Sequence, residues 1–455
     1  MLVIGSGPAG QKAAIQAAKV GKSVALIEMT RELGGCCVQR GTIPSKTLRE
    51  NALRVKNMRS IAELSNFKLA EHTELATLID RLDEVLAAHD HYMRRQLQRN
   101  QIQIIHGRAR FISPTQVEIE KVRGDTLKLN SEHIVIATGS FPRQPANIDI
   151  DHEHLFDSDS ILSMLYLPKS LIVLGGGVIA SEYASIFQAL GVAVTMIDKY
   201  PTPLGFLDED LTEKFVEDFI AMGGTWEGNR HVTRAHWNGC DAVVVECQDG
   251  STFSADKLLC AAGRMANVEH LAIENAGLST NDAGLISVDE RLCTSVPTIY
   301  AAGDVIGPPS LASASMEQGR RASRNAYKLK TGDMQKLLPS GIYSIPELSA
   351  VGLSEKQARA EHNDIIVGRA DFSEIARGQI SGIQNGMLKI ICDAQGEYVL
   401  GVQIVGEGAT ELIHIGQMAI VNKATVDIFV DCIFNFPTLA EAYRVAALEV
   451  IGARR

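Results

Sequence analysis

The sequence predicts an α/β protein with two Rossmann-like dinucleotide-binding domains and a C-terminal α+β domain. The first observation is a repeat: residues 2–28 and 171–198 each read as strand, glycine turn, helix and a second strand that ends in an acid. The second observation is that such glycine motifs stop near residue 336, after which mixed strands and helices follow. Two βαβ units in one chain are expected to hold two different dinucleotides.

The two units correspond at a constant spacing of 170 positions. The first glycine of the pattern permits a tight turn, the second admits a pyrophosphate, the third lets the helix pack closely, and the acid binds a ribose. The first unit supplies Gly5, Gly7, Gly10 and Glu28, and the second supplies Gly175, Gly177, Ala180 and Asp198. One such motif is weak evidence, whereas two in the same strand and helix context are strong.

The remaining segments fit between and after these units. Residues 76–99 alternate apolar and charged positions at helical spacing, which predicts a long surface or interface helix. Short β-like runs follow at 102–106 and 134–139, and the second run ends in Thr138 and Gly139. Residues 294–304 predict another strand, which ends in Gly303 and Asp304.

Composition argues against several classes of partner. The net charge of −10, the pI near 5.7 and an aromatic content of 5% argue against nucleic acid. Residues 1–4 run directly into a glycine motif, and no run of about 18 apolar residues exists, so we expect a soluble, cytoplasmic protein without a membrane span. None of the eight cysteines is spaced like a zinc site, and we expect free, buried thiols.

Residues 34–46, GGCCVQRGTIPSK, resemble the redox-active segment of flavoprotein disulfide reductases, whose pattern is GG-x-C-x4-C-x-P-x-K. Further likeness covers 156–164, 182–187, 303–315, 340–347 and 434–448. On these residues the chain is identified as a member of the FAD-dependent pyridine nucleotide-disulfide oxidoreductases. The resemblance implies an FAD-binding domain over 1–145, completed by 268–335, an NAD(P)-binding domain over 146–267, and a dimerisation domain over 336–455.

The resemblance also implies where the cofactors bind. Lys46 would lie near flavin N5, paired with Glu182, and these two residues and Cys37 are the catalytic candidates. The cofactor-binding candidates include the same three residues. Those outside the second unit are Gly5, Gly7, Gly10, Glu28, Gly34, Gly35, Cys36, Thr42, Thr138, Gly139, Gly263, Arg264, Gly303, Asp304 and Ala312. Those for the nicotinamide dinucleotide are Gly175, Gly177, Ala180, Asp198 and Lys199.

Two positions depart from the disulfide reductases. Cys37 fills the first cysteine position of the redox segment but Thr42 fills the second, and a hydroxyl closes no disulfide. Phe436 stands where the family has a proton-shuttling histidine, contributed across the dimer. Glu441 and Tyr443 are expected at the interface. Cys37 itself is either a low-pKa thiolate or a packed thiol, and we favour the packed thiol.

These departures predict hydride transfer between NADPH and NAD⁺ through flavin N5 without a redox disulfide. FAD is the expected cofactor, NAD(H) and NADP(H) are the expected substrates, and a homodimer or higher homo-oligomer is the expected assembly. Asp198 favours NAD, whereas Lys199 and Ala180 favour NADP, so we expect both to bind with NAD(H) preferred. The alternatives are an NADH oxidase or diaphorase, a dihydrolipoamide-dehydrogenase-like flavoprotein, and a non-catalytic flavin-binding sensor.

Overall fold

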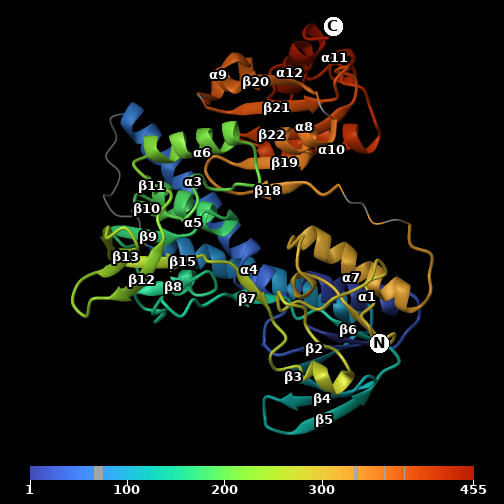
Figure 1. Ribbon diagram of the computed structural model, residues 1–455. Coiled ribbons are helices and arrows are strands. Elements are labelled where there is room, and N and C mark those ends of the chain that lie inside the picture. The colour runs from blue at the N-terminus through green and yellow to red at the C-terminus, as the bar shows by residue number, and fades with distance from the viewer. Residues whose placement is uncertain (66–74, 333, 335–336, 363, 384, 455) are drawn as a thin grey trace.

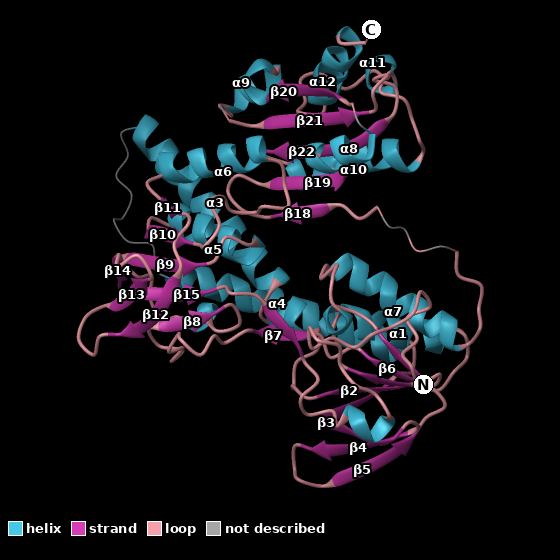
Figure 2. Ribbon diagram, in the orientation of Figure 1, coloured by secondary structure: helices cyan, strands magenta, loops and turns pink. Residues whose placement is uncertain are grey.

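Three bodies of secondary structure make up the chain in Figure 1. The computed structural model describes residues 1–455 except 66–74, 333, 335–336, 363, 384 and 455. The body at lower right contains the N-terminus, the body at left is built from the middle of the chain, and the body at the top is C-terminal. Figure 2 shows that each body combines strands and helices, as the α/β prediction requires.

A seven-stranded sheet forms the body at lower right (Figure 1). Its order is β17 (Ile299–Ala301), β6 (Ile134–Ile136), β1 (Leu2–Ile4), β2 (Ala25–Glu28), β3 (Gln103–Ser113), β4 (Gln116–Lys121) and β5 (Thr126–Asn130). The first five strands pair in parallel, whereas β4 and β5 extend the edge antiparallel. β1 and β6 are wholly apolar and buried, as expected for parallel strands covered on both faces.

Helices α1 (Pro8–Lys19) and α7 (Ala312–Ala326) pack tightly against each other beside this sheet. A Cβ atom at Gly319 would lie 1.9 Å from the carbonyl oxygen of Ala9, so only glycine permits this approach. α2 (Gly35–Gln39) and α3 (Thr42–Ser65) carry the redox-like segment, and α4 (Leu75–Arg99) is the long helix that the sequence predicts. α3 reaches the middle body, where Arg59 donates hydrogen bonds to the carbonyl oxygens of Ala189 and Leu190.

The second glycine unit lies in a five-stranded parallel sheet. Its order is β11 (Thr225–Glu227), β10 (Ala193–Ile197), β9 (Ser170–Leu174), β15 (Lys257–Cys260) and β8 (Leu155–Asp157). The helices of this body are α5 (Val178–Ala189) and α6 (Glu209–Ala221). A three-stranded sheet, β12 (Val232–Trp237), β13 (Val243–Cys247) and β14 (Thr252–Ala255), adjoins it, and β7 (Ser140–Pro142) pairs with β16 (Arg264–Ala266) where the chain enters and leaves this body.

The C-terminal body is an antiparallel sheet with helices, which confirms the predicted α+β class. The order is β18 (Ser340–Ile342), β19 (Leu348–Gly352), β22 (Val399–Val405), β21 (Met387–Cys392) and β20 (Ile366–Asp371). α10 (Ala409–Val421) packs on β22 and β19, and α12 (Glu441–Gly452) packs on β20 and β21. The other helices are α8 (Glu355–His362), α9 (Ala376–Ser381) and α11 (Ile428–Asp431).

Four short 3₁₀ turns complete the described elements: η1 (Ile161–Ser163), η2 (Ile273–Ala276), η3 (Asp304–Ile306) and η4 (Phe372–Glu374). Predicted elements agree with these bounds in type, while three strands differ in length. The strands predicted at 294–304 and 134–139 are confined to β17 and β6, and the one predicted at 102–106 continues to Ser113. The exact domain boundaries stay predictions.

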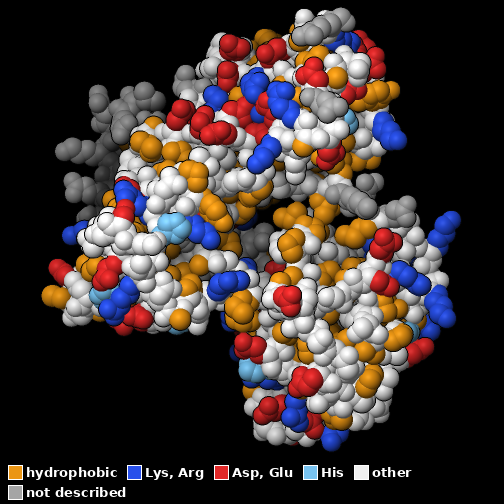
Figure 3. Space-filling model, in the orientation of Figure 1, with side chains coloured by type: hydrophobic (Ala, Val, Ile, Leu, Met, Phe, Trp, Pro, Cys, Tyr) orange, Lys and Arg blue, Asp and Glu red, His pale blue; other side chains and the backbone are white. Residues whose placement is uncertain are grey.

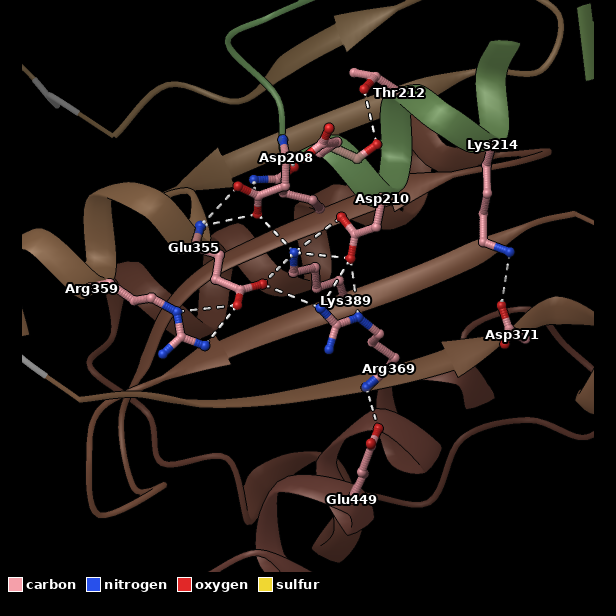
Figure 4. Close-up of polar contacts among 12 residues, drawn as sticks. Asp208, Asp210, Thr212, Lys214, Glu355, Arg359, Arg369, Asp371, Lys389 and Glu449 are labelled. Carbon is pink, nitrogen blue, oxygen red and sulfur yellow. Dashed lines mark hydrogen bonds and ion pairs between the residues drawn. The ribbon is translucent and has the colours of Figure 1, made fainter. Parts of the chain in front are cut away.

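A buried ionic cluster, the Lys389 cluster, joins α6 to the C-terminal sheet (Figure 4). The Lys389 ammonium, whose side chain is 1% exposed, lies 3.0 Å from Asp208, 3.1 Å from Asp210 and 2.8 Å from Glu355. Arg369 adds contacts of 3.0 Å to Asp210 and 3.2 Å to Glu355. Burial of Lys389 acts to lower its pKa, but its hydrogen bonds to Glu355 and Asp208 and the charge of Asp210 outweigh burial and raise that pKa.

Three further expectations from the sequence can be compared with the structure. Tyr443, expected at the interface, is instead wholly buried in the C-terminal core, where its hydroxyl donates to Leu412 O and accepts from Gly416 N. All eight cysteines are free, but only Cys247, Cys260 and Cys392 are buried, and Cys36, Cys37 and Cys293 are half-buried. Cys240 and Cys432 are exposed because neither lies in a helix or strand that packs into a core. Among the described residues, no helix has the length and apolar character needed to cross a membrane.

Candidate active site

A cavity of about 1080 Å³ runs from the first glycine unit to the C-terminal domain. In Figure 3 the surface is hollowed between the lower right body and the C-terminal body, with hydrophobic side chains around the opening. Most of the predicted site residues line this one cavity: Gly5, Gly7, Glu28, Gly35, Cys36, Cys37, Thr42, Lys46, Thr138, Gly139, Glu182, Arg264, Gly303, Asp304 and Ala312. Tertiary structure therefore gathers segments that are far apart in the sequence.

The first glycine turn opens the N-terminus of α1 into the cavity. Gly5 has a positive φ of 100°, and a Cβ there would lie 2.3 Å from Ala137 O. A Cβ at Gly10 would lie 1.9 Å from Gly5 O, so Gly10 does not line the cavity but seats the helix on the turn. At Gly7 an added Cβ would meet no atom of the described residues within 4 Å. This geometry suits an anionic pyrophosphate at a helix N-terminus.

Glu28, at the end of β2, is held in place by its neighbours. Its carboxylate accepts hydrogen bonds from the Ser6 amide at 2.9 Å and the Ser6 hydroxyl at 2.6 Å. The Thr30 amide donates to its other oxygen at 3.0 Å. The side chain is 6% exposed and lies at the cavity edge, the position that the pattern assigns to a ribose-binding acid.

The redox-like segment brings Cys37 and Thr42 together without a second thiol. Both side chains line the cavity, and burial raises the pKa of Cys37 although the Thr42 hydroxyl and the Lys46 charge oppose it. Burial also raises the pKa of the adjacent Cys36 to about 12, against the effect of Arg264. Both pKa values favour the packed-thiol interpretation of Cys37 over a reactive thiolate.

Lys46 and Glu182 form an ion pair at the cavity wall. The Lys46 Nζ atom lies 2.8 Å and 2.7 Å from the two carboxylate oxygens of Glu182. The Glu182 side chain is 6% exposed and that of Lys46 is 24% exposed. The backbone amide of Tyr343 donates to Glu182 at 2.9 Å, and the Tyr343 ring centre is 4.9 Å from Nζ.

Arg264 organises the opposite wall, next to Asp304. The guanidinium donates to Ser140 Oγ at 2.9 Å and to Asp159 at 2.9 Å, and Ser140 Oγ donates to Asp304 at 2.7 Å. Its Nη2 atom also lies 3.3 Å from Cys36 Sγ. The sequence predicts Arg264 and Asp304 but misses Ser140 and Asp159. The likeness at 156–164 is the one signal available for Asp159, no motif marks Ser140, and only the fold brings them together.

The second glycine unit lies beyond this cavity wall. Gly175 has a positive φ of 117°, and at Gly177 an added Cβ would again meet no described atom within 4 Å. Asp198 accepts a hydrogen bond from the Tyr200 amide at 3.0 Å, and the ammonium of Lys199 lies 5.0 Å from the Tyr200 ring centre. The two sites meet at α5, whose Glu182 lines the cavity and whose N-terminus follows Gly177.

The other predicted residues outside the cavity lining have packing or turn positions. A Cβ at Gly34 would lie 2.5 Å from Val38, so this glycine makes room for α2. Ala180 is fully buried in α5, and Gly263 has a positive φ of 102° with its carbonyl accepting from Arg143 N.

The C-terminal domain also lines the cavity with residues that the sequence does not predict as site residues, among them Tyr343, Thr410 and His414. The SGIYSIPE likeness at 340–347 is the one signal available for Tyr343. Thr410 and His414 lie on α10, and no motif marks either of them. The C-terminal domain therefore contributes to the cavity that the first glycine unit opens.

The residues present fit a flavin dinucleotide. The cavity contains a glycine turn at a helix N-terminus, an acid at the end of the second strand, and the lysine–glutamate pair at its other end. The Thr138 hydroxyl lines the cavity, is buried, and has no hydrogen-bond partner among the described residues. A bound ligand with polar groups would satisfy this atom.

Two dinucleotide units on either side of such a cavity define a flavin- and nicotinamide-dependent oxidoreductase. The chain belongs to the pyridine nucleotide-disulphide oxidoreductases: the model of that family matches residues 1–319, and the model of its dimerisation domain matches 338–447. This confirms the resemblance found in the sequence.

Among its relatives, soluble pyridine nucleotide transhydrogenases align over nearly the whole chain. The one from Mycobacterium tuberculosis (strain ATCC 25177 / H37Ra) is 42% identical, covering 100% of this chain and 97% of the relative. The one from Pseudomonas putida (strain W619) is 40% identical, covering 99% and 97%.

Solved structures of similar fold include LpdA from Mycobacterium tuberculosis, with a TM-score of 0.91 and 27% identity, covering 99% of each chain. The HOCl-induced flavoprotein disulfide reductase RclA from Escherichia coli has a TM-score of 0.88 and 30% identity, covering 98% of this chain and 99% of that one.

Proposed function

We propose that the protein is an FAD-dependent NAD(P)⁺ transhydrogenase that passes hydride from NADPH to NAD⁺ without a redox disulfide. One observation carries the proposal: Thr42 stands beside Cys37 in the cavity wall, where the family's second thiol would be, while the Lys46–Glu182 pair is intact. The names of the relatives at 40% and 42% identity support it.

The first unit and the cavity walls would hold FAD. Gly7 and the N-terminus of α1 would take the pyrophosphate, Glu28 the adenosine ribose, and Asp304 the ribityl chain, with residues 34–37 beside the flavin. When bound, FAD supplies hydride transfer at N5, accepting hydride from one nicotinamide and returning it to another. Cys36 and Cys37 would stay protonated and packed, since burial raises the pKa of each thiol.

Lys46 would place a positive charge at the reacting end of the cavity, where negative charge develops during reduction. Glu182 holds that ammonium with both of its carboxylate oxygens, at 2.8 Å and 2.7 Å. Because the pair is largely shielded from water, its electrostatic effect on a bound ligand is stronger than that of a surface lysine.

The second unit would bind NAD(H) and NADP(H) in turn at one site. Asp198 favours the free 2′-hydroxyl of NAD, whereas Lys199 offers a cation to the 2′-phosphate of NADP. We therefore propose that both nucleotides react and that NAD(H) is preferred.

Phe436 supports the absence of dithiol chemistry. Its side chain is 75% exposed on the C-terminal domain, at the position that would face a partner subunit, and its ring has no titratable proton to exchange.

We propose a homodimer that works in the cytoplasm and binds no nucleic acid. The match to a dimerisation domain supports the assembly.

Anaerobic stopped-flow spectroscopy tests the proposal. NADPH should bleach the flavin absorbance, and an NAD⁺ analogue added next should restore it while becoming reduced. Bleaching by NADH alone, with none by NADPH, would instead indicate an NADH oxidase or diaphorase. Reduction of lipoamide would indicate a dihydrolipoamide-dehydrogenase-like enzyme, and slow turnover with every acceptor would indicate a flavin-binding sensor.

A further inference from the structure

The Lys46–Glu182 pair contacts a third segment, the clamp segment, which comprises residues 340–347 of the C-terminal domain. The Tyr343 amide donates to Glu182 Oε1 at 2.9 Å, and the Tyr343 ring lies beside Lys46 Nζ. Two residues on, the Ile345 amide donates to Ser185 Oγ at 3.0 Å. Ser185 is three residues after Glu182 on α5, so the clamp segment holds that helix at two successive points.

Arg49 holds the same segment from the other side. The Ser344 carbonyl accepts a hydrogen bond from Arg49 Nε at 3.0 Å. This carbonyl and the Ile345 amide belong to one peptide unit, which therefore joins α3 to α5. Arg49 is three residues after Lys46 on α3, so both members of the catalytic pair have a neighbour one turn away that binds this peptide.

A buried ion pair fixes the Arg49 side chain. Its Nη2 atom lies 2.9 Å from Glu347 Oε1, and the two side chains are 8% and 11% exposed. The other carboxylate oxygen of Glu347 accepts from the Thr410 amide at 3.1 Å and the Thr410 hydroxyl at 2.9 Å. Arg49 therefore reaches the start of α10 through Glu347. A planar guanidinium can bind a carbonyl and a carboxylate together in fixed directions, which a lysine cannot reproduce.

We propose that Arg49 is a positioning residue for the Lys46–Glu182 pair: by holding the Ser344 carbonyl and Glu347, it sets the Tyr343 amide and ring against the two charges. The inference rests on the proposed function, because it concerns the same pair. It also makes the C-terminal domain part of the site, since the clamp segment and Thr410 belong to that domain.

Three variants test the proposal on the FAD-loaded enzyme. Arg49→Met removes the contacts to Ser344 and Glu347, together with an ion pair to the exposed Glu50. Arg49→Lys keeps the charge, and Glu347→Gln keeps the shape but removes the anion. Arg59→Met is the matched control, because Arg59 also lies on α3 and also binds carbonyls near α5, but at the far end of α5, away from the pair.

Arg49→Met should lower kcat for NADPH-to-NAD⁺ hydride transfer about tenfold with KM changed less than about twofold, because small misplacements of reacting groups mainly slow the reaction. The midpoint potential of the bound flavin should become more negative, since Lys46 no longer stabilises the reduced form as well. Arg49→Lys should recover part of both effects, and Glu347→Gln should give a smaller change of the same sign. Arg59→Met should leave the potential unchanged.

Amide hydrogen exchange gives a second readout that needs neither flavin nor activity. Faster exchange at Tyr343 and Ile345 in Arg49→Met or, if that variant does not fold, in Glu347→Gln supports the proposal. Unchanged exchange at these amides, or a flavin potential that Arg59→Met shifts equally, overturns it. If the unmodified enzyme transfers no hydride from NADPH to NAD⁺, the proposed function is wrong, while exchange and potential still decide the role of Arg49.

Discussion

Lys389 and Lys46 both bind carboxylates at contacts between domains, and they differ in what else surrounds them. Lys389 is 1% exposed and touches Asp208, Asp210 and Glu355, which come from the start of α6 and from the C-terminal domain. Lys46 is 24% exposed, pairs with one carboxylate, and lies at the wall of the large cavity.

The Lys389 cluster is closed, whereas the Lys46 pair faces space for a ligand. In the cluster, Arg369 and Arg359 add positive charge around Glu355 and Asp210, so three cations balance three carboxylates. A closed cluster of this kind holds α6 in a fixed position against the C-terminal sheet. An ammonium with a cavity on one side can instead act on a bound molecule.

The largest expected effect is on stability at Lys389. Lys389→Met would leave the buried Asp208 and the partly buried Asp210 and Glu355 without their central cation, and we expect a loss of ~3–5 kcal/mol in the free energy of unfolding. Urea unfolding measures it. Lys121→Met is the control, since that lysine forms an exposed pair with Asp125 and should cost less than about 1 kcal/mol. Equal losses in both variants would contradict the distinction between a closed cluster and a surface pair.

Lys46→Met should act on the reaction instead. Loss of the cation at the cavity wall is expected to slow flavin reduction by NADPH about 10²-fold, the effect of removing one preorganised electrostatic group. Its cost in the free energy of unfolding should be smaller than that of Lys389→Met, because Glu182 keeps the Tyr343 amide. Stopped-flow reduction and urea unfolding measure the two effects. Lys56→Met is the control, because Lys56 is exposed on the same helix. A stability loss without a rate loss would show that Lys46, like Lys389, acts on stability and not on the reaction.

The stability that the Lys389 cluster contributes should depend on pH. Although burial acts to raise it, hydrogen bonds from Lys389 and Arg359 lower the pKa of Glu355 from 4.5 to about 2. This group therefore contributes stability that is fully present above pH 4.5 and is lost as the pH falls toward 2. The raised pKa of Lys389 adds stability that is present below pH 10.5 and lost as the pH rises above it.

Thermal unfolding across pH 2 to 4.5 measures the Glu355 contribution. Glu355→Gln should lower the transition temperature most near pH 4.5 and progressively less toward pH 2, so its curve is shallower than that of the unmodified protein. Parallel curves for the two proteins would show that Glu355 does not titrate with folding.

The smallest effect is expected at Lys199, which lies on the surface beside the second unit. Lys199→Ala should weaken NADPH binding about threefold to fivefold, or ~1 kcal/mol, and leave NADH nearly unchanged. Asp198→Asn should improve NADPH relative to NADH, since it removes a charge that repels the 2′-phosphate. Dissociation constants of NADPH and NADH for each variant, from a titration that does not depend on the flavin, measure these changes. Equal changes for both nucleotides would exclude a role of the residue in selecting between them.

The sequence by itself determined the α/β class and the two dinucleotide units. These follow from local spacing, because a glycine turn, a helix and an acid lie within about thirty residues. The resemblance at 34–46 adds the prediction that this site forms no disulfide, since Thr42 lies five residues after Cys37. The likenesses at 34–46 and 182–187 pointed to Lys46 and Glu182, and the structure places the two side chains together across 136 positions of sequence.

Only the tertiary structure decided which residues support that pair and which join the domains. The Arg49 contact to Ser344 spans 295 positions, and the Lys389 cluster draws its carboxylates from the start of α6 and from α8. Tyr443 belongs to the core and not to the interface for the same reason, since its partners Leu412 and Gly416 lie on another helix. Periodicity assigns a residue to a helix or a strand, but the partner of a buried polar side chain is set by how distant elements pack.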